Sequence, residues 1–252
     1  GKGFIHGEKR YGTLCVRART KYRVGLRFSA IFHPCLAHLW TGPLIGRIIH
    51  GPDCVAEGAV WLAARDPVMQ HVLSQTGPLP LRREAEGFGA LLYAILGQQV
   101  SVASARALWA RLEAASLTGA DRICATAEED LRALGLSWQK ARYAKALAEA
   151  KIDYAALSLC PDAQVIATLT AVTGIGQWTA EIYAMFALGR ADVFASGDLA
   201  LQEAVRMAYG LPNRPTSKAM AQMAQQWSPW RAVAARALWS YYALAKAREG
   251  IG

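Results

Sequence analysis

Apolar residues recur every three to four positions through most of the chain after residue 50, which places them on one face of successive α-helices. In Phe88–Leu96, for example, Leu91, Leu92, Ile95 and Leu96 fall along one such face. No segment reads convincingly as a strand. The predicted helices are 55–64, 67–76, 88–96, 101–115, 126–135, 138–150, 161–170, 177–188, 199–209, 216–227 and 229–248. The pattern therefore predicts an all-α fold.

Local residue choices mark several of the predicted helix starts. Ser101 and Ser137 precede apolar-periodic segments, and a serine there can cap the helix with its hydroxyl oxygen. Thr126 followed by Glu129 matches a capping box, in which the two side chains satisfy each other's backbone amides. Pro161 suits the first position of a helix because its φ is already helical.

The positive charge of the chain is concentrated near its N-terminus. The formal net charge is +9, but residues 1–50 hold nine Lys or Arg and one Glu, whereas residues 51–252 hold 19 Lys or Arg and 18 acidic residues. Proline and histidine interrupt the uncharged stretch that follows the basic residues, which disfavours a signal peptide or membrane anchor. We expect residues 1–46 to be a basic extension outside the catalytic fold, with an arm that follows DNA phosphates as the alternative.

Several function classes lack their sequence signals. The five cysteines lie far apart with no C-x-x-C pair, which disfavours a zinc ribbon, an iron–sulfur cluster and a disulfide scaffold and favours a reducing, cytoplasmic compartment. The chain has no Walker loop, no G-x-G-x-x-G and no H-E-x-x-H. Nucleotide hydrolysis, hydride transfer and zinc proteolysis therefore have no support.

The most informative segment is the run around Gly174-Ile175-Gly176, between one predicted helix and the next. Glycines allow a positive φ and a close approach of another backbone. The free amides at the start of the second helix then offer a phosphate site that needs no basic side chain. A plain helix–helix turn is the alternative.

Two further segments bear on the choice between a phosphate site and a plain helix–helix turn. Asp198 stands at the start of a predicted helix, 22 positions beyond Gly176, where an ordinary N-cap aspartate is the simple interpretation. Gln98 and Gln99 form an unusual pair of glutamines at a helix break, for which a polar loop is the simple interpretation.

Together and in this order, these segments resemble the helix-hairpin-helix DNA glycosylase superfamily. The runs Ile-Leu-Gly-Gln-Gln-Val-Ser, Gly-Ile-Gly-Gln-Trp-Thr-Ala and Asp-Val-Phe-x-x-x-Asp-Leu-x-Leu-Gln are similar to the 3-methyladenine DNA glycosylase II (AlkA-type) branch, in its short form, over about residues 53–246. The resemblance implies two helical lobes with an active-site cleft between them. The domain would be 47–252, with lobe one at 47–87 plus about 190–252 and lobe two at about 88–189, carrying the hairpin 169–188.

The resemblance also implies roles for individual residues. Asp198 matches the catalytic aspartate that stabilises positive charge on the sugar. Trp178 and Trp239 match base-pocket positions, where Ile182 stands at a family aromatic position and Tyr183 lies one place beyond it. Trp178 also stands where bifunctional branches have a lysine nucleophile, which implies hydrolysis without strand cleavage. The tryptophans expected in the core are Trp40, Trp61, Trp109 and Trp138.

The remaining implied residues contact DNA. Gln99, or its neighbour Gln98, would fill the gap left by the flipped base. The phosphate-binding hairpin would consist of Thr173, Gly174, Ile175, Gly176, Gln177 and Thr179. Family hairpins often bind a monovalent cation, Na⁺ or K⁺, through loop carbonyls, here near Thr173. No other cofactor and no iron–sulfur cluster are expected.

The implied function is DNA repair by excision of alkylated purines, such as 3-methyladenine and 7-methylguanine, from double-stranded DNA, leaving an abasic site. Alternatives are a monofunctional glycosylase for another damaged base, such as hypoxanthine, uracil or an oxidised purine, and a non-catalytic helix-hairpin-helix DNA-binding protein. We expect a cytoplasmic monomer with no membrane partner, associated with the nucleoid if the source is bacterial.

Overall fold

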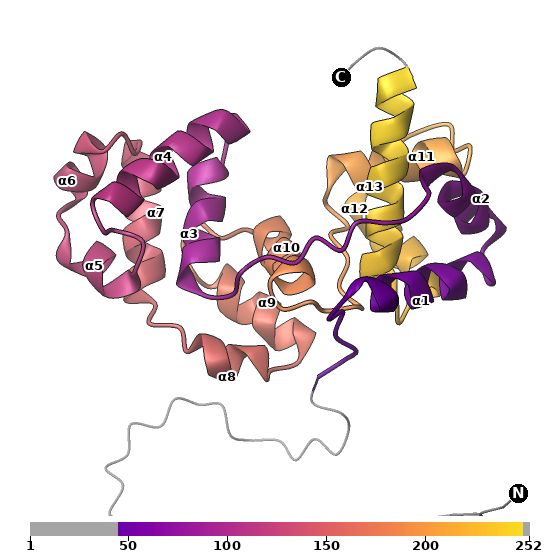
Figure 1. Cartoon of the computed structure of the whole chain (residues 1–252), viewed down its shortest axis with the longest axis horizontal. Coiled ribbons are helices and arrows are strands. Elements are labelled where there is room, and N and C mark those ends of the chain that lie inside the picture. Colours follow the sequence, from indigo (N-terminus) through magenta and orange to yellow (C-terminus); the bar gives the residue numbers. More distant parts are fainter. Residues whose placement is uncertain (1–44, 249–252) are drawn as a thin grey trace, which may run out of the picture. The chain divides into compact units, whose positions relative to one another are not determined.

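The computed structural model describes residues 45–248, which form helices and their connections (Figure 1). No strand is assigned within these residues, where one isolated antiparallel bridge joins Ile48 to Arg190. The prediction of an all-α fold is confirmed. Residues 1–44, with almost all of the predicted extension 1–46 and with Trp40, lie outside the described residues, as do residues 249–252.

The helices follow the predicted order. They are α1 (Pro52–Ala63), α2 (Pro67–Thr76), α3 (Phe88–Gly97), α4 (Val102–Ala114), α5 (Ala120–Ala125), α6 (Glu128–Ala133), α7 (Trp138–Glu149), α8 (Tyr154–Ser158), α9 (Asp162–Thr170), α10 (Gln177–Phe186), α11 (Leu199–Ala208), α12 (Ser217–Met223), the 3₁₀ helix η1 (Ala224–Trp227) and α13 (Arg231–Arg248). The short helices α5 and α8 were not predicted, because five or six residues are too few to show a helical period.

Serine caps are confirmed, but the capping box is wrong. The Ser101 hydroxyl accepts from the Ser104 amide at 3.2 Å, and the Ser137 hydroxyl accepts from the Lys140 amide at 3.3 Å. Thr126 instead ends α5, because its hydroxyl donates to the Arg122 carbonyl at 2.8 Å. The next helix, α6, begins two residues later at Glu128, after the N-cap Ala127, which forms no side-chain capping bond. Pro161 similarly lies one position before α9 rather than inside it.

Contacts between the helices fall into two groups. One group surrounds α13, which contacts α1, α2, α11 and η1, and η1 contacts α12 in turn. The other group joins α3 to α4, α7 and α10, α7 to α5 and α6, and α10 to α9. Figure 1 shows α13 (yellow) beside α1 and α2 (indigo), although these helices come from opposite ends of the described chain.

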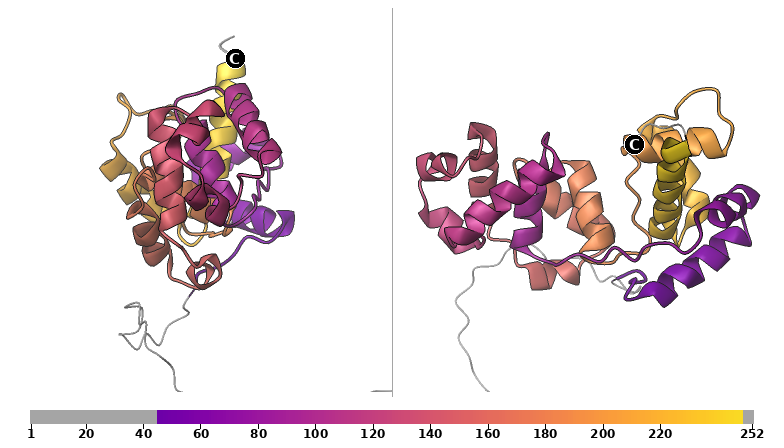
Figure 2. Two further views of the ribbon diagram at one scale, coloured as in Figure 1. Left: turned by 90° about the vertical axis from the view of Figure 1, so that its left-hand side faces the viewer. Right: turned by 45° about the horizontal axis from the view of Figure 1, so that its top comes forward.

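Extended connections link the two groups through backbone hydrogen bonds. The Ile49 amide donates to the Gly189 carbonyl at 2.7 Å, and the Glu84 amide donates to the Phe186 carbonyl at 3.0 Å. The side chain of Ile49 is fully buried. The segments before α1 and before α3 are thus fastened to the end of α10, and Figure 2 shows these connections from two further sides.

Alanine and glycine allow close packing around α13. Residues 232–238 of this helix are all buried. Four of the seven are alanines and one is a valine, and the other two are Arg236 and Leu238. A Cβ added at Gly58 of α1 would lie 2.7 Å from Val233 and 2.8 Å from Trp230, so only glycine fits this crossing. Within residues 45–248, no helix combines the length and the apolar character needed to cross a membrane.

The expected core tryptophans divide in two. Trp61 and Trp109 are partly buried against the hydrophobic core, as predicted. Trp138 is 52% exposed, so the core interpretation is wrong for it. Trp138 is the first residue of α7, and its ring centroid lies 5.5 Å from the guanidinium carbon of Arg132 in α6.

We expect Asp66→Ala to lower the free energy of unfolding by about 3 kcal/mol. The Asp66 carboxylate caps α2 through the Val68 amide at 2.9 Å and accepts from Trp227 Nε1 at 3.1 Å and from the Tyr209 hydroxyl. The variant leaves the buried Trp227 indole and the partly buried Tyr209 hydroxyl without this acceptor. Chemical denaturation measures the loss.

Asp153→Ala is the matched control for this prediction. Asp153 caps α8 through the Ala156 amide at 2.9 Å but is exposed. Its loss should cost about 1 kcal/mol. Equal losses in the two variants would contradict a structural role of the buried Asp66 contacts.

Candidate active site

The carboxylate of Asp198 is held by three N–H groups from three helices. As the N-cap of α11, Asp198 accepts the Leu201 amide on Oδ1 at 2.9 Å. Trp239 Nε1 of α13 donates to the same oxygen at 3.1 Å, and Trp178 Nε1 of α10 donates to Oδ2 at 2.8 Å. The simple interpretation as an N-cap is therefore correct but incomplete, because two indoles bind the same carboxylate.

Trp178 lies at the open side of this cluster. It is in the first turn of α10 and is 48% exposed, which makes it one of the few large apolar side chains exposed in the described residues. Leu199, directly after Asp198, is 62% exposed. Exposed apolar side chains next to a bound carboxylate indicate a ligand surface rather than core packing.

Trp239 lies on the more buried side of the Asp198 cluster, where it rests on Phe186 and, through it, on Arg236, two residues that the sequence did not indicate. Its ring packs against Phe186 with the ring centroids 5.7 Å apart. The Arg236 guanidinium carbon lies 4.8 Å from the centroid of Phe186, and Arg236 donates to the Leu81 carbonyl. Burial lowers the pKa of Arg236 to about 10, so this side chain stays charged at neutral pH. In the sequence, the arginine within the alanine-rich run of α13 could have indicated this buried contact.

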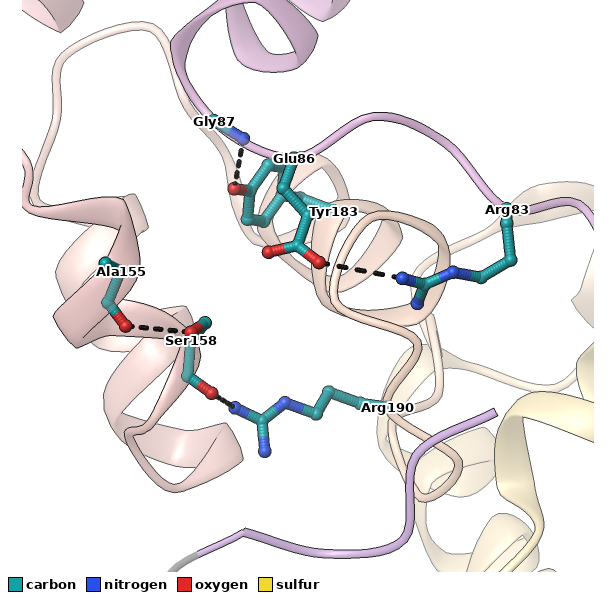
Figure 3. A network of polar contacts seen from close by, with 7 residues as sticks. All are labelled: Arg83, Glu86, Gly87, Ala155, Ser158, Tyr183 and Arg190. Carbon is teal, nitrogen blue, oxygen red and sulfur yellow. Dashed lines mark hydrogen bonds and ion pairs between the residues drawn. The ribbon is translucent and has the colours of Figure 1, made fainter. Parts of the chain in front are cut away.

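Ile182 and Tyr183 face different surroundings. Ile182 comes one turn after Trp178, so the two share a face of α10. Tyr183 is only 4% exposed, and its hydroxyl accepts from the Gly87 amide at 2.8 Å (Figure 3). Burial raises the pKa of this hydroxyl. The Tyr183 hydroxyl thus supports the segment before α3, and a role for Tyr183 in the base pocket stays a prediction.

The hairpin between α9 and α10 gives its two glycines different tasks. Gly174 has a φ of +98°, and an added Cβ would lie 2.3 Å from the Tyr143 ring. Gly176 has an ordinary φ of −86°, is exposed, and an added Cβ would meet nothing within 4 Å. Gly174 is needed for the turn, whereas Gly176 leaves open space in front of α10.

The other predicted hairpin residues divide by exposure. Thr173 and Gln177 are exposed, whereas Ile175 and Thr179 are buried. No side chain caps α10, so its first amides, including those of Gln177 and Thr179, lack helical partners. A phosphate would therefore be bound by backbone amides.

Gln98 and Gln99 take separate positions after α3. The Gln98 amide nitrogen Nε2 donates to the Gly174 carbonyl at 2.9 Å, which ties this turn to the hairpin. Gln99 is exposed and has a φ of +56°. Of the two candidates, Gln99 is the side chain that is free to project from the turn.

A cavity of about 380 Å³ lies beside the hairpin, lined by residues that include Gln177, Glu181 and Ser196. Glu181 is 6% exposed, and burial raises the pKa of its carboxyl group. One of its oxygens accepts from Gln177 Nε2 at 2.8 Å. The residues that line this cavity do not include Asp198, Trp178 or Trp239, so Glu181 is not assigned as an acid partner of Asp198.

Across residues 45–248, no group of three or more His, Cys, Asp or Glu side chains is placed to hold a metal ion. In the hairpin, the Gly174 carbonyl accepts Gln98 and the Val172 carbonyl accepts the Ile175 amide at 3.0 Å. A monovalent cation at these carbonyls stays a prediction.

The fold is that of the helix-hairpin-helix DNA glycosylases. The chain belongs to the HhH-GPD superfamily of base excision DNA repair proteins, whose family model matches residues 92–229.

Relatives with known names agree with this assignment. DNA-3-methyladenine glycosylase 1 of Schizosaccharomyces pombe is 31% identical over 173 residues, which cover 64% of this chain and 74% of that protein. DNA-3-methyladenine glycosylase 2 of Escherichia coli is 31% identical over 162 residues, covering 58% of this chain and 54% of that protein. The match to YfjP of Bacillus subtilis covers only 40% of that relative's length.

Two solved structures support the same fold over about three quarters of the chain. DNA-3-methyladenine glycosidase from Bacillus halodurans superimposes with a TM-score of 0.67 at 30% identity, covering 78% of this chain and 91% of that one. The S. pombe enzyme Mag1, solved in complex with abasic DNA, superimposes with a TM-score of 0.63 at 27% identity, covering 73% and 95%.

We expect Gly174→Ala to lower the free energy of unfolding by about 2–4 kcal/mol, because alanine is strained at positive φ and its methyl group would overlap Tyr143. Gly176→Ala should stay within about 1 kcal/mol of the unaltered protein. Thermal or chemical unfolding of both variants provides the comparison. A larger loss in Gly176→Ala would contradict the division of tasks between the two glycines.

Proposed function

We propose that this chain removes alkylated purines, of the 3-methyladenine and 7-methylguanine type, from double-stranded DNA by hydrolysing the N-glycosidic bond. The observation that carries the proposal is the carboxylate of Asp198 between the indoles of Trp178 and Trp239. The relatives named as 3-methyladenine glycosylases support the same substrate class.

The chemistry explains why one carboxylate suffices. Breaking the bond between base and sugar develops positive charge at C1′ of the deoxyribose, and a nearby anion lowers the energy of that state. Oδ2 of Asp198 accepts a single indole hydrogen bond, so it keeps acceptor capacity toward the sugar. A purine methylated at N3 or N7 is already cationic and leaves as a neutral base, so it needs no strong acid.

The two indoles supply base selectivity. Trp178 and Trp239 flank the carboxylate with electron-rich rings, and stacking of a cationic purine on such a ring gains about 0.5–2 kcal/mol. Ile182, on the same helix face as Trp178, adds an apolar surface without a polar group. A normal, neutral purine gains less from this pocket.

Access to the base requires flipping it out of the duplex. Gln99 would enter the space left behind, where its amide can hydrogen-bond the orphaned base. The amides at the start of α10, with the exposed Gly176 before them, would hold a backbone phosphate near the flipped nucleotide. The two contact groups of helices would form the two lobes around the DNA.

The same site supports hydrolysis without strand cleavage. A lyase needs an amine that attacks C1′ and forms a Schiff base. The corresponding position carries Trp178, whose indole nitrogen donates a hydrogen bond and is not a nucleophile. The product would be an intact strand with an abasic site. The protein would act in the compartment that contains the DNA.

Two other functions remain as alternatives. Excision of a neutral damaged base, such as hypoxanthine, uracil or an oxidised purine, would need an acid to protonate the leaving group, and Glu181 lines a separate cavity. A non-catalytic DNA-binding protein would need the hairpin but not the carboxylate between two indoles. The first alternative thus needs an acid beside Asp198, and the second leaves the carboxylate between two indoles unexplained.

We expect Asp198→Asn to reduce base release from methylated duplex DNA by at least about 100-fold, because the negative charge at the sugar is lost. Binding of abasic DNA should change by less than about threefold, since most of the affinity comes from phosphate contacts. Chromatography of released bases and a gel-shift titration measure the two effects.

Asp153→Asn is the matched control, because Asp153 caps α8 as Asp198 caps α11 but lies in a different element. It should keep full activity. Full base release by Asp198→Asn would show that Asp198 is not the catalytic residue.

We also expect the DNA product to break only after alkali treatment. The wild-type chain should release base and leave strands that run at full length on a denaturing gel until hot alkali cleaves the abasic sites. Strand breaks without alkali would contradict the interpretation of Trp178.

A further inference from the structure

Lys140 forms a buried contact at the end of α3 that the proposed mechanism has not used. It lies in the first turn of α7, is 8% exposed, and its ammonium donates to the Leu96 carbonyl at 2.6 Å. Leu96 belongs to the last turn of α3, whose carbonyls lack helical partners and carry partial negative charge. The ammonium thus binds the end of the helix that leads directly into Gln98 and Gln99.

Within the described residues, no carboxylate lies at ion-pair distance from Lys140. Burial lowers the pKa of Lys140. The charge is therefore directed to the α3 carbonyl end alone. A buried lysine without an acidic partner is unusual unless its position serves a purpose.

The turn that follows α3 needs such support. Gln99 has a φ of +56°, a conformation that a residue with a side chain adopts only where its surroundings hold it. A cavity of about 220 Å³ adjoins the turn, lined by Gln98, Gln99, Val100, Ser137, Gln139 and Lys140. Packing is therefore incomplete on this side, and polar contacts must take its place.

Two polar contacts fasten the turn on opposite sides. Lys140 holds the residue before it, at Leu96, to α7. Gln98 holds the turn itself to the hairpin through the Gly174 carbonyl. The hairpin also packs against α7, because Gly174 lies against the Tyr143 ring. The turn, α7 and the phosphate-binding hairpin are thus joined in one closed set of contacts.

We propose that Lys140 is a positioning residue for base flipping, which acts with Gln98 to hold the turn 97–100 so that Gln99 is set to enter the DNA. This rests on the proposed function and on Gln99 as the inserting residue. A turn that is already ordered loses no conformational freedom when its side chain enters the duplex, so flipping is favoured. Neither Lys140 nor Gln98 needs to contact the flipped base.

The test compares Lys140→Met and Gln98→Ala on two DNA substrates under single-turnover conditions. In one, 7-methylguanine is paired in a duplex, and in the other the same base stands unpaired in a one-nucleotide bulge. We expect each variant to release the paired base about tenfold more slowly, the effect of one lost charge-assisted or buried hydrogen bond. Release from the bulge should stay within about twofold, because the base there is already unpaired.

Lys145→Met is the matched control. Lys145 lies on the same helix and binds the carbonyls of Ile123, Cys124 and Thr126 at the end of α5, with distances of 3.3, 2.7 and 2.9 Å. It therefore loses the same kind of helix-end contact away from the turn. Any loss of activity in this variant should be equal on the two substrates, whatever its effect on thermal stability.

Equal losses on paired and bulged DNA in Lys140→Met and Gln98→Ala would overturn the inference and leave these residues a purely structural role. If Lys140→Met does not fold, Gln98→Ala alone must show the preference for the bulge, and its absence there overturns the inference. No base release from either substrate by the unaltered protein would instead remove the proposed function, and the inference with it.

Discussion

The carboxylate of Asp198 accepts hydrogen bonds from three helices, one of which it caps. Trp178 comes from α10, the Leu201 amide from α11 and Trp239 from α13. This arrangement requires the start of α10 to lie beside the start of α11. It also requires α13, near the C-terminal end of the described chain, to pack against both. The buried Arg236 of α13 contacts the ring of Phe186 in α10 and donates to the Leu81 carbonyl, so it helps to hold α13 against α10.

In the proposed function, the hairpin and the turn after α3 would bind DNA through backbone geometry more than through charge. Residues 51–252 contain almost equal numbers of basic and acidic side chains, and the oriented amides at the start of α10 offer a phosphate site that needs no basic side chain. Gly174 makes the turn possible, and Gly176 leaves the space in front of the α10 amides open. The strained Gln99 depends on the same logic, because its φ is held by neighbours and not by its own preference.

The sequence predicted the helices well wherever an apolar period was at least two turns long or a serine cap was present. It failed for α5 and α8, which are too short for a period, and for Thr126, whose hydroxyl bonds backward to Arg122 and not forward. For the site, the resemblance to the helix-hairpin-helix glycosylases brought Asp198, Trp178 and Trp239 together as candidates. It could not separate Ile182 from Tyr183, because the difference lies in a hydrogen bond from Gly87, nearly a hundred residues away. Lys140 was missed for the same reason, since its partner is a backbone carbonyl.

In the proposed mechanism, Asp198 acts as an anion toward positive charge on the sugar. The most direct test is the affinity of the protein for duplex DNA with one of two abasic-site analogues, a protonated pyrrolidine and a neutral tetrahydrofuran. We expect the wild-type protein to bind the cationic analogue at least about tenfold more tightly than the neutral one, and Asp198→Asn to remove this preference. An equal preference in both proteins would contradict the claim.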